Sequence, residues 1–311
     1  MRSRILIGTR GSELALWQAN WVNDQLVNLY PQFNFDIKTV KTSGDKILDV
    51  PLAKIGGKAL FTKEIDNALI HHEIDIAVHS LKDVPTQIPN QLIIGAITQR
   101  ADVRDALISR GDKPLSQFPQ GASIATGSLR RRSLLLHYRP DFQLVDIRGN
   151  LNSRFRKFDE ADWEGMVLAV AGIKRMGWEE RISEKVSLDI ILPAVGQGSF
   201  AVICRKDDAE MLEILAAINH RPAELATRAE RAMLRTLEGG CQVPIGAYGE
   251  VENDNLKLTG SIGSLDGKET VRDCHEGDAG EPENIGHTLA QKLLEQGGER
   301  ILEAVFSEQR S

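Results

Sequence analysis

Arginine is concentrated in one stretch of the chain, residues 128–157, where its abundance predicts binding of anions. The planar guanidinium group binds a carboxylate or a phosphate through two parallel hydrogen bonds, which the point charge of lysine does not do. The stretch holds eight cations and two aspartates, a local charge of +6 in a chain of net charge −6. The cations are Arg130, Arg131, Arg132, Arg139, Arg148, Arg154, Arg156 and Lys157. A solvated basic helix face is the alternative interpretation.

Two strand-to-helix junctions each place a threonine, a serine and free helix amides where an open α/β sheet binds anions. The first is Thr9-Arg10-Gly11-Ser12, and the second runs from Thr126 to Arg131. In each, the threonine ends a predicted strand and the serine is placed to cap the next helix. Because helix amino ends at the carboxyl ends of strands favour negative charge, we expect two anion cradles. Ordinary helix capping is the alternative for either one.

Asp83 stands directly after a predicted strand, in the segment Ser80 to Pro85. A carboxylate close to several arginines is expected to be a fixed negative charge and a poor general base. Such a charge is suited to stabilise a cationic intermediate or to accept a hydrogen bond from a ring N–H group. Alternatively, Asp83 only begins the turn before Pro85.

Two glycine pairs each precede a side chain that could take part in chemistry. Gly239-Gly240 precede Cys241, and glycine allows the backbone there to approach another domain closely. Cys241 is thus a candidate for a special role, and a buried spectator thiol is the alternative. Gly56-Gly57 precede Lys58 and predict a flexible lid or an exposed turn.

Whole-chain composition excludes several classes. With 41% hydrophobic and 26% charged residues, the 311-residue chain is typical of a globular protein with more than one core. Its net charge of −6 opposes binding to nucleic acid or an anionic membrane. No apolar run is long enough for a spanning helix or a signal peptide, so we expect a cytoplasmic protein. Cysteine and histidine spacing predicts neither a disulfide framework nor a metal site.

The first half alternates apolar runs with amphipathic helical patterns, which predicts an α/β sheet built from strand-helix-strand units. A helix capped by Ser12 is expected to end before Pro31. The expected strands are Arg4–Gly8, Phe35–Val40, Ile74–Val78, Ser123–Thr126 and Met166–Val170.

An internal repeat follows from two pairs of similar segments. Ile7–Leu14 aligns with Ile124–Leu129 when two residues are skipped, and Ala77–Asp83 aligns without gaps with Ala169–Arg175. The repeat predicts two similar α/β lobes that face each other across a cleft, with Asp83 and Arg175 at equivalent positions.

Composition changes after about residue 220, and the pattern predicts a smaller α+β domain there. It begins with a helix from Pro222 to Leu237. Strands around Val243–Tyr248, Leu256–Ile262 and Thr270–Cys274 and a helix from Pro282 to Phe306 follow. The Pro and Gly content of Leu192–Phe200 suits a crossover or hinge.

Together these motifs resemble the porphobilinogen deaminase family, also called hydroxymethylbilane synthases. The strings that carry the resemblance are Thr9-Arg10-Gly11-Ser12, Leu16-Trp17-Gln18-Ala19, Gly56-Gly57-Lys58 with Leu60-Phe61, Ala77 to Pro85, Ser128-Leu129-Arg130-Arg131, Arg148-Gly149-Asn150 with Arg154, and Glu238 to Pro244. The chain departs from the family at Gly127, where serine is common. The resemblance implies three domains, the first two similar to periplasmic binding proteins. We expect residues 1–98 with 199–216 to form the first lobe, 104–192 the second, and 221–311 the C-terminal domain.

The resemblance also implies an activity. The family condenses four porphobilinogen molecules head to tail, with loss of ammonia each time, and hydrolyses the linear tetrapyrrole from a dipyrromethane cofactor. That cofactor is attached through a thioether, here at Cys241. The expected ligands are porphobilinogen and its oligopyrrole intermediates, and we expect a monomer that binds neither nucleic acid nor membrane.

Carried over residue by residue, the resemblance implies roles for the side chains. Asp83 is the expected catalytic residue. Expected cofactor contacts are Lys82, Asp83, Thr126, Ser128, Arg130, Arg131 and Arg148. Expected substrate contacts are Arg10, Ser12, Lys58, Arg148, Arg154 and Arg175.

Two other classes would also use arginines. A non-catalytic anion-binding sensor needs a cleft lined with arginine but no cysteine on a Gly-Gly loop. An RNA-binding protein would use the stretch from Arg130 to Lys157, although few aromatic side chains there offer base stacking.

Overall fold

The computed structural model describes residues 3–46, 61–237 and 243–310. Cys241 and Lys58 lie outside these residues. The described chain divides into two compact units. The first comprises residues 3–46, 61–101 and 198–224, and the second comprises 102–197 and 225–310. Each unit is described by itself below.

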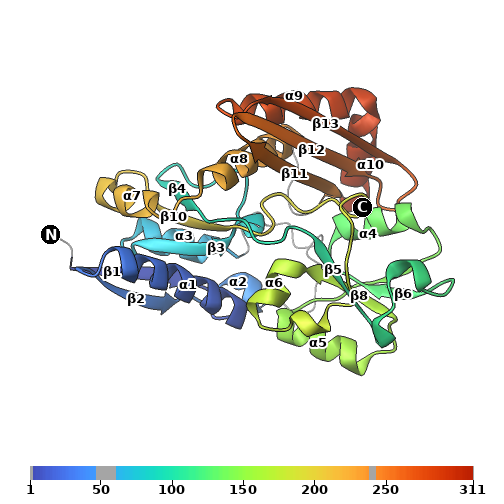
Figure 1. The fold of residues 1–311 in the computed structure, drawn as a ribbon, viewed down its shortest axis with the longest axis horizontal. Helices are drawn as coiled ribbons and strands as arrows, with labels where there is room; N and C mark the ends of the chain where they lie inside the picture. The colour runs from blue at the N-terminus through green and yellow to red at the C-terminus, as the bar shows by residue number, and fades with distance from the viewer. Residues whose placement is uncertain (1–2, 47–60, 238–242, 311) are drawn as a thin grey trace. The chain divides into compact units, whose positions relative to one another are not determined.

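The first unit is built on a five-stranded mixed sheet, which we call lobe 1 together with its helices (Figure 1). Strand β1 pairs in parallel with β2 and β3, whereas β10 runs antiparallel between β3 and β4. In spatial order the strands are β2 (Asn34–Thr39), β1 (Arg4–Thr9), β3 (Ile76–Ser80), β10 (Phe200–Arg205) and β4 (Leu92–Ile97).

A second five-stranded sheet, which we call lobe 2 with its helices, repeats this order and these directions. Strand β6 pairs in parallel with β7 and β8, and β5 runs antiparallel between β8 and β9. In spatial order the strands are β7 (Gln143–Val145), β6 (Ser123–Ala125), β8 (Gly165–Ala169), β5 (Asp105–Ser109) and β9 (Glu184–Lys185). The prediction of two similar α/β lobes is confirmed by this shared topology.

The strand register corrects one of the two repeat alignments. Ile7 of β1 lies beside Ile76 of β3, and Ile124 of β6 lies beside Gly165 of β8. Ser80 and Ala169, the last residues of their strands, are therefore equivalent, whereas the sequence alignment matched Ala169 with Ala77. The alignment was wrong by three residues, because a short apolar strand repeats its pattern with little to fix its register. The equivalent of Asp83 is Gly172 rather than Arg175.

Helices cover both sheets. Around lobe 1 are α1 (Glu13–Leu29), α2 (Ser43–Lys46), α3 (Lys63–Ile70), α7 (Ala209–Ala216) and the short turn η2 (Leu81–Asp83). Around lobe 2 are α4 (Leu129–Tyr138), α5 (Leu151–Glu160), α6 (Val170–Arg175) and the turns η3 (Arg110–Asp112), η4 (Leu115–Gln117) and η5 (Glu179–Arg181). As predicted, Ser12 caps α1 by accepting from the Ala15 amide, and Ser128 caps α4 by accepting from the Arg131 amide.

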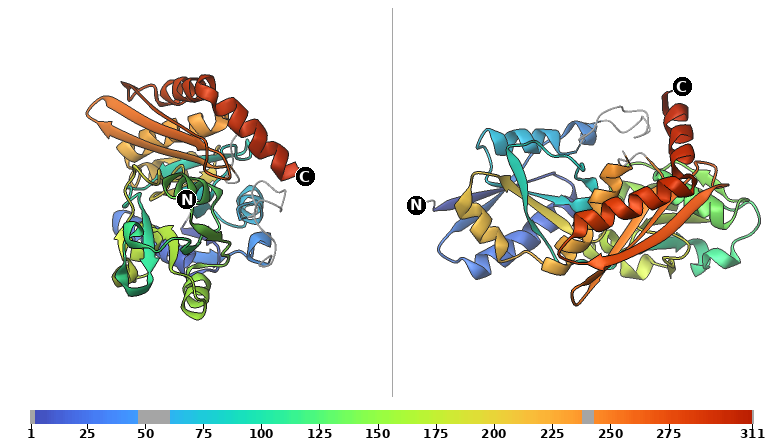
Figure 2. Two further views of the ribbon diagram at one scale, coloured as in Figure 1. Left: turned by 90° about the vertical axis from the view of Figure 1, so that its right-hand side faces the viewer. Right: turned by 90° about the horizontal axis from the view of Figure 1, so that it is seen from above.

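The C-terminal part of the second unit is a three-stranded antiparallel meander with helices, as predicted. Its strands are β11 (Ile245–Glu252), β12 (Asn255–Gly263) and β13 (Thr270–Asp278). The helices are α8 (Arg221–Thr236), α9 (Pro282–Leu293), the π-helical turn η6 (Leu294–Gly298) and α10 (Glu299–Arg310). Figure 2 shows α9 lying along one face of this sheet. The expected single last helix is interrupted, because Gly297 adopts a φ of 105°.

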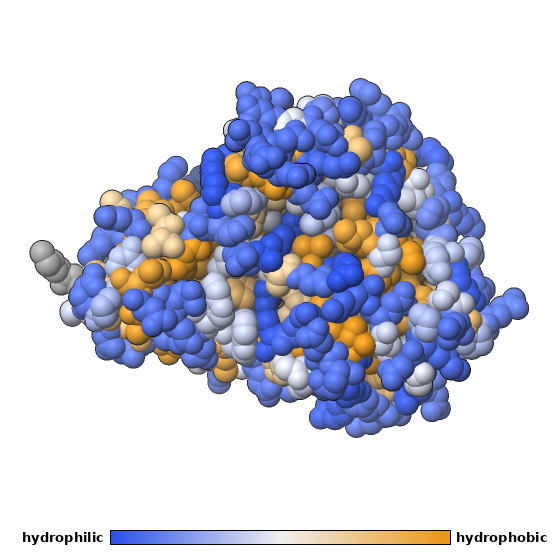
Figure 3. Space-filling model, in the orientation of Figure 1, coloured by the Kyte–Doolittle hydropathy of each residue, from blue (hydrophilic) through white to orange (hydrophobic). Residues whose placement is uncertain are grey.

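Polar side chains cover most of the face shown in Figure 3, with apolar ones scattered between them. Large exposed apolar side chains include Trp17, Val27 and Leu29 on α1. None of the helices among the described residues is long and apolar enough to cross a membrane.

Candidate functional site

A pocket in lobe 1 lies where β1 and β3 end, the edge at which open α/β sheets bind ligands. It brings together three predicted site residues, Arg10, Ser12 and Asp83. The other lining residues are Leu14, Ala15, Gln18, Phe61, Val78, His79 and Ser80. Residues from α1, β3 and η2 thus converge on one site.

Arg10 supplies the positive charge of this pocket. The Cζ atom of its guanidinium lies 4.2 Å from the centre of the Phe61 ring, a cation–π contact that orients the group. The next ring, His79, is 5% exposed. Burial, and then the charge of Arg10, lower the pKa of His79 to about 4. The imidazole is therefore neutral at pH 7, and its buried Nε2 atom has no hydrogen-bond partner among the residues that the structure describes.

The carboxylate and the hydrogen-bonding groups stand beside this cation. Asp83 ends η2 and is exposed, so its charge is available to a ligand. Gln18 donates from Nε2 to the Ser80 hydroxyl at 2.8 Å, which links α1 to β3. A guanidinium, a carboxylate and a neutral imidazole in one pocket suit a small ligand with both acidic groups and an N–H group.

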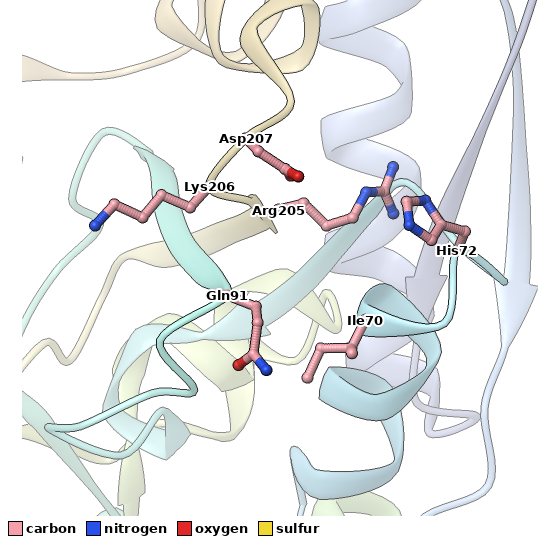
Figure 4. A pocket seen from close by; sticks show the side chains of 6 residues that line it. All are labelled: Ile70, His72, Gln91, Arg205, Lys206 and Asp207. Carbon is pink, nitrogen blue, oxygen red and sulfur yellow. The ribbon is translucent and has the colours of Figure 1, made fainter.

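Lobe 1 has a second pocket at the opposite edge of the sheet, where β3 begins and β10 ends (Figure 4). Its buried cation, Arg205, is already engaged. The guanidinium donates to the carbonyl oxygens of Leu69 and Ile74 and to the carboxylates of Asp75 and Asp208. Figure 4 shows Lys206 pointing away from the other lining side chains. These bonds link α3 to β10, so Arg205 has a structural role. We therefore take the first pocket as the candidate site.

In lobe 2, the predicted anion-binding pair Arg130 and Arg131 converges on a buried carboxylate. Nη1 of Arg130 donates to Oδ2 of Asp105 at 2.8 Å, and Nη2 of Arg131 donates to Oδ1 at 2.8 Å. Both side chains come from the first turn of α4, and Asp105 begins β5. The arginines are 4% and 5% exposed, and Asp105 is fully buried.

This cluster holds one more positive than negative charge. Burial alone would raise the pKa of Asp105, but the charges and hydrogen bonds of Arg130 and Arg131 hold it below its ordinary value. The Nε atoms of both arginines are buried and have no hydrogen-bond partner within residues 3–46, 61–237 and 243–310. A buried excess of positive charge with unused donors fits a ligand that carries carboxylates, such as a dipyrromethane.

The second strand-to-helix junction has the serine cap expected of it. The Ser128 amide donates to the Thr126 hydroxyl at 3.3 Å, and Thr126 is 2% exposed. A Cβ atom on Gly127 would lie 2.5 Å from the carbonyl oxygen of Ile147. Close approach of these two backbones therefore explains glycine at position 127.

The remaining predicted arginines are half-buried in lobe 2. Burial lowers the pKa of Arg148 below its ordinary value, although Asp146 opposes the shift. Arg154 donates from Nε to the Gly149 carbonyl at 2.8 Å. Burial lowers the pKa of Arg175 to about 10, so this group is still charged at pH 7. Lys82, in lobe 1, is also half-buried.

The basic stretch does not act as one surface. Arg130 and Arg131 form ion pairs with Asp105, and Arg139 forms an ion pair with Asp141 at 2.7 Å. Excess charge alone therefore overstated the area of the predicted anion site. In the part of the chain that the structure describes, no group of three His, Cys, Asp or Glu side chains is placed to hold a metal ion.

Sequence reasoning missed several members of both sites. Phe61, His79 and Ser80 line the lobe 1 pocket without having been assigned there. Position offered a signal for His79 and Ser80, because residues at the end of β3 lie at the same edge of the sheet as Asp83. Asp105 gave no signal, since nothing in sequence links it to arginines 25 residues away.

Comparisons with known proteins cover nearly the whole chain. Residues 5–213 match a family model described as porphobilinogen deaminase, dipyromethane cofactor binding domain. Residues 224–295 match the porphobilinogen deaminase C-terminal domain. A porphobilinogen deaminase of Desulforamulus reducens is 52% identical over 305 residues, 98% of this chain and 99% of that protein. One from Carboxydothermus hydrogenoformans is 51% identical over 305 residues, 98% of each chain.

Solved structures show more distant likenesses. The periplasmic VFT2 domain of Bordetella pertussis BvgS is 13% identical, with a TM-score of 0.41 over 70% of this chain and 87% of that one. The aliphatic sulphonate binding protein SsuA of Escherichia coli is 14% identical, with a TM-score of 0.40 over 76% of this chain and 71% of that one.

Proposed function

This chain belongs to the porphobilinogen deaminase family, and we propose that Asp83 and the arginines of its two lobes carry out the family's reaction. The enzyme is a transferase of porphyrin and tetrapyrrole biosynthesis. It joins four porphobilinogen molecules head to tail with loss of four ammonia molecules. Water then releases the linear product, hydroxymethylbilane.

The cofactor-binding residues are proposed from both lobes. The family model that covers residues 5–213 is that of a dipyrromethane-binding domain. We place the covalent attachment, a thioether, at Cys241. When bound, the dipyrromethane supplies the free pyrrole carbon to which the first substrate unit is added. The residues proposed to hold it are Lys82, Asp83, Thr126, Ser128, Arg130, Arg131 and Arg148.

Substrate recognition follows from the charge of porphobilinogen, whose pyrrole carries an acetate and a propionate. The observation that carries this proposal is the lobe 1 pocket, because Arg10 and Asp83 both line it. The proposed carboxylate-binding residues are Arg10, Ser12, Lys58, Arg148, Arg154 and Arg175.

Asp83 is proposed to act as a fixed negative charge. When the protonated amino group of porphobilinogen leaves as ammonia, the remaining methylene and ring form a cationic azafulvene. A carboxylate that accepts from the ring N–H stabilises this developing charge without moving a proton itself. The pyrrole carbon of the preceding unit then bonds to the methylene and loses its proton to water. The neutral ring of His79 adds no competing charge.

The remaining features of the proposal concern the whole chain. We propose a cytoplasmic monomer that does not bind nucleic acid. Its domains are proposed to comprise residues 1–98 with 199–216, residues 104–192, and residues 221–311.

Replacement of Asp83 tests the catalytic proposal. Asp83→Asn removes one preorganised charge from the reacting centre, which typically costs about 3 kcal/mol, or about a hundredfold in rate. The fold should be intact because Asp83 is exposed. Single-turnover consumption of porphobilinogen measures the effect, and Asp83→Glu should be milder. A D83N enzyme with the wild-type rate would show that Asp83 only begins a turn.

Mass analysis tests the proposed attachment at Cys241. Peptides of the active enzyme should carry two linked pyrrole rings on Cys241, and Cys241→Ala should abolish activity. Buried Cys204 and exposed Cys274 provide matched controls, because serine at either position should leave activity in place. Active enzyme with an unmodified Cys241 would refute the assignment.

A further inference from the structure

We propose that Asp105 is a positioning residue that aims Arg130 and Arg131 at the carboxylates of the bound dipyrromethane, and that Gln197 holds Asp105 in place. This inference rests on the proposed function, in which the two arginines touch the cofactor. Neither Asp105 nor Gln197 has a role in that proposal. Asp105 acts on the site through the arginines, and Gln197 acts through Asp105.

Each arginine is fixed at two points, which sets the plane of its guanidinium. Arg130 donates to Asp105 and also to the Leu192 carbonyl oxygen at 2.6 Å. Arg131 donates to Asp105 and also to the Val167 carbonyl oxygen at 3.0 Å. Because a bidentate bond to a carboxylate needs a defined plane, this double anchoring favours productive orientation of the unused donors.

Asp105 is the only one of these anchors that the arginines share. Each of its oxygens accepts from a different guanidinium, so one carboxylate sets the angle between two side chains that would otherwise repel each other. Loss of this charge would leave two cations in a buried site with no carboxylate between them. The arginines would then be expected to turn apart.

Gln197 fixes the carboxylate itself. Its side chain is buried, and Nε2 donates to Oδ1 of Asp105 at 2.9 Å and to the Val103 carbonyl at 2.7 Å. The side-chain amide of Gln197 thus supplies donors to a carboxylate without adding charge. A carboxylate at position 197 would have the same size, lose these donors and cancel the excess positive charge of the cluster.

The same bonds lie at two of the three points where the described chain passes between the two compact units, at residues 101–102 and 197–198. Val103 and Gln197 stand just inside the second unit at these crossings. A ligand that orders the arginines should therefore also protect the backbone of residues 103–105 and 195–197. This effect is measurable apart from catalysis.

The experiment compares four variants of the full chain: Asp105→Asn, Asp105→Glu, Gln197→Glu and the control Asp102→Asn. Asp102 lies three residues from Asp105 and pairs with Arg104 on a more exposed surface, so it matches the substitution without touching the cluster. Apoprotein from cells that make no porphobilinogen is incubated with porphobilinogen. Intact mass follows the gain of a two-ring unit, and Tm is measured before and after loading.

We expect D105N and Q197E to load at least tenfold more slowly than wild type, D105E to recover part of the rate, and D102N to load normally. The rise in Tm on loading should shrink in D105N and Q197E. A purely structural role would lower Tm equally in both forms and leave the loading rate of folded protein unchanged, which would overturn the proposal.

Hydrogen exchange supplies an independent readout. In wild type, loading should slow exchange at residues 103–105 and 195–197, and this protection should be lost in Q197E. If D105N does not fold, the loading rate of Q197E becomes the test, and normal loading by Q197E would overturn the proposal. Wild-type protein that never gains two rings would refute the proposed function as well, whereas normal loading by every variant would refute this inference alone.

Discussion

Two equivalent residues in the lobes, Phe200 and Asp105, show how one topology carries two chemistries. Each begins the antiparallel strand of its sheet, and each lies opposite the last residue of the neighbouring strand, Ser80 or Ala169. Phe200 packs edge-on against Trp17 and Trp21, with ring centres 6.3 and 5.7 Å apart. Asp105 instead accepts from two arginines.

The difference lies in the helix that follows the first strand of each sheet. In lobe 1 that helix presents indole rings, and the position opposite is filled by an apolar ring. In lobe 2 it presents guanidinium groups within its first turn, and the position opposite is a carboxylate. Sheet order and register are the same in both lobes, so neither determines the chemistry. The difference is determined by a few side chains at the strand ends.

Replacing Phe200 should give the largest effect on stability. Phe200→Ala removes a ring that is 3% exposed and leaves a cavity beside two tryptophans, so the free energy of opening lobe 1 should fall by about 3 to 5 kcal/mol. Hydrogen exchange at β3 and β10 measures this loss, since the whole chain is not expected to unfold in one step.

Phe200→Asp sharpens the same comparison. It copies the lobe 2 residue into lobe 1, where the facing side chains are indoles rather than guanidiniums. It should therefore be more destabilising than alanine, because it buries a charge without a partner. If Phe200→Ala and Phe200→Asp lowered the stability of lobe 1 equally, positions 200 and 105 would not differ in their ability to accommodate a charge.

Protonation of His79 should cost lobe 1 about 2 kcal/mol in acid, whereas the buried Asp66 carboxyl of α3, whose pKa is raised to about 6, acts in the opposite direction. The folded pKa of His79 is about 4, below the 6.5 of a free histidine, so between these values the unfolded chain binds a proton that the folded chain does not. The stability contributed by neutral His79 is therefore complete above pH 6.5 and is lost as pH drops toward 4. At pH 5 the loss from this group is about 2 kcal/mol.

Exchange of β3 amides at pH 5 and 7, corrected for the intrinsic rate, tests this expectation. Strand β8 should change less, because Asp105 is held ionised throughout this range. His79→Leu should remove most of the β3 effect, while the same change at exposed His71 should not. A β3 loss that persists in H79L would assign the acid sensitivity to another group.

The local pattern of the sequence predicted the elements well. Apolar runs predicted β1, β2, β3, β6 and β8 to within two residues, and serine caps predicted the starts of α1 and α4, because both signals depend on neighbours in sequence. The lobe strands β4, β5, β7, β9 and β10 were not among the expected strands. The clustering of Arg10, Ser12 and Asp83 was also accessible, since strand ends share one edge of a sheet. The roles of these residues came from the family resemblance, and they stay predictions.

Contacts between distant segments were not accessible. Nothing near Asp105 in sequence indicates its arginines, and nothing near Gln197 indicates Val103, because the sheet brings them together from 92 or 94 residues apart. The three-residue error between Ala77 and Ser80 has the same origin. Register is set by pairing with strands elsewhere in the chain, which a local alignment does not contain.

The helix caps provide the smallest and most specific test of the comparison. Ser12→Ala removes the hydroxyl that accepts from the Ala15 amide, and should ease opening of the first turn of α1 by about 1 kcal/mol. Ser128→Ala removes the matching bond to the Arg131 amide. That first turn is also held by the ion pairs of Arg130 and Arg131, so opening it should require breaking them too. Exchange at the α4 amino end should therefore change less than at α1.

The effects on stability of losing the Asp105 ion pairs and of losing the Ser128 cap of α4 should then be coupled. In an Asp105→Asn background the first turn loses its shared carboxylate, so Ser128→Ala should cost as much there as Ser12→Ala does in wild type. Cap and cluster restrain the same residues, and contacts that restrain the same residues do not add. A double mutant whose loss equals the sum of the single losses would mean that Asp105 does not hold the start of α4. The two lobes would then differ in charge but not in how their first helices are anchored.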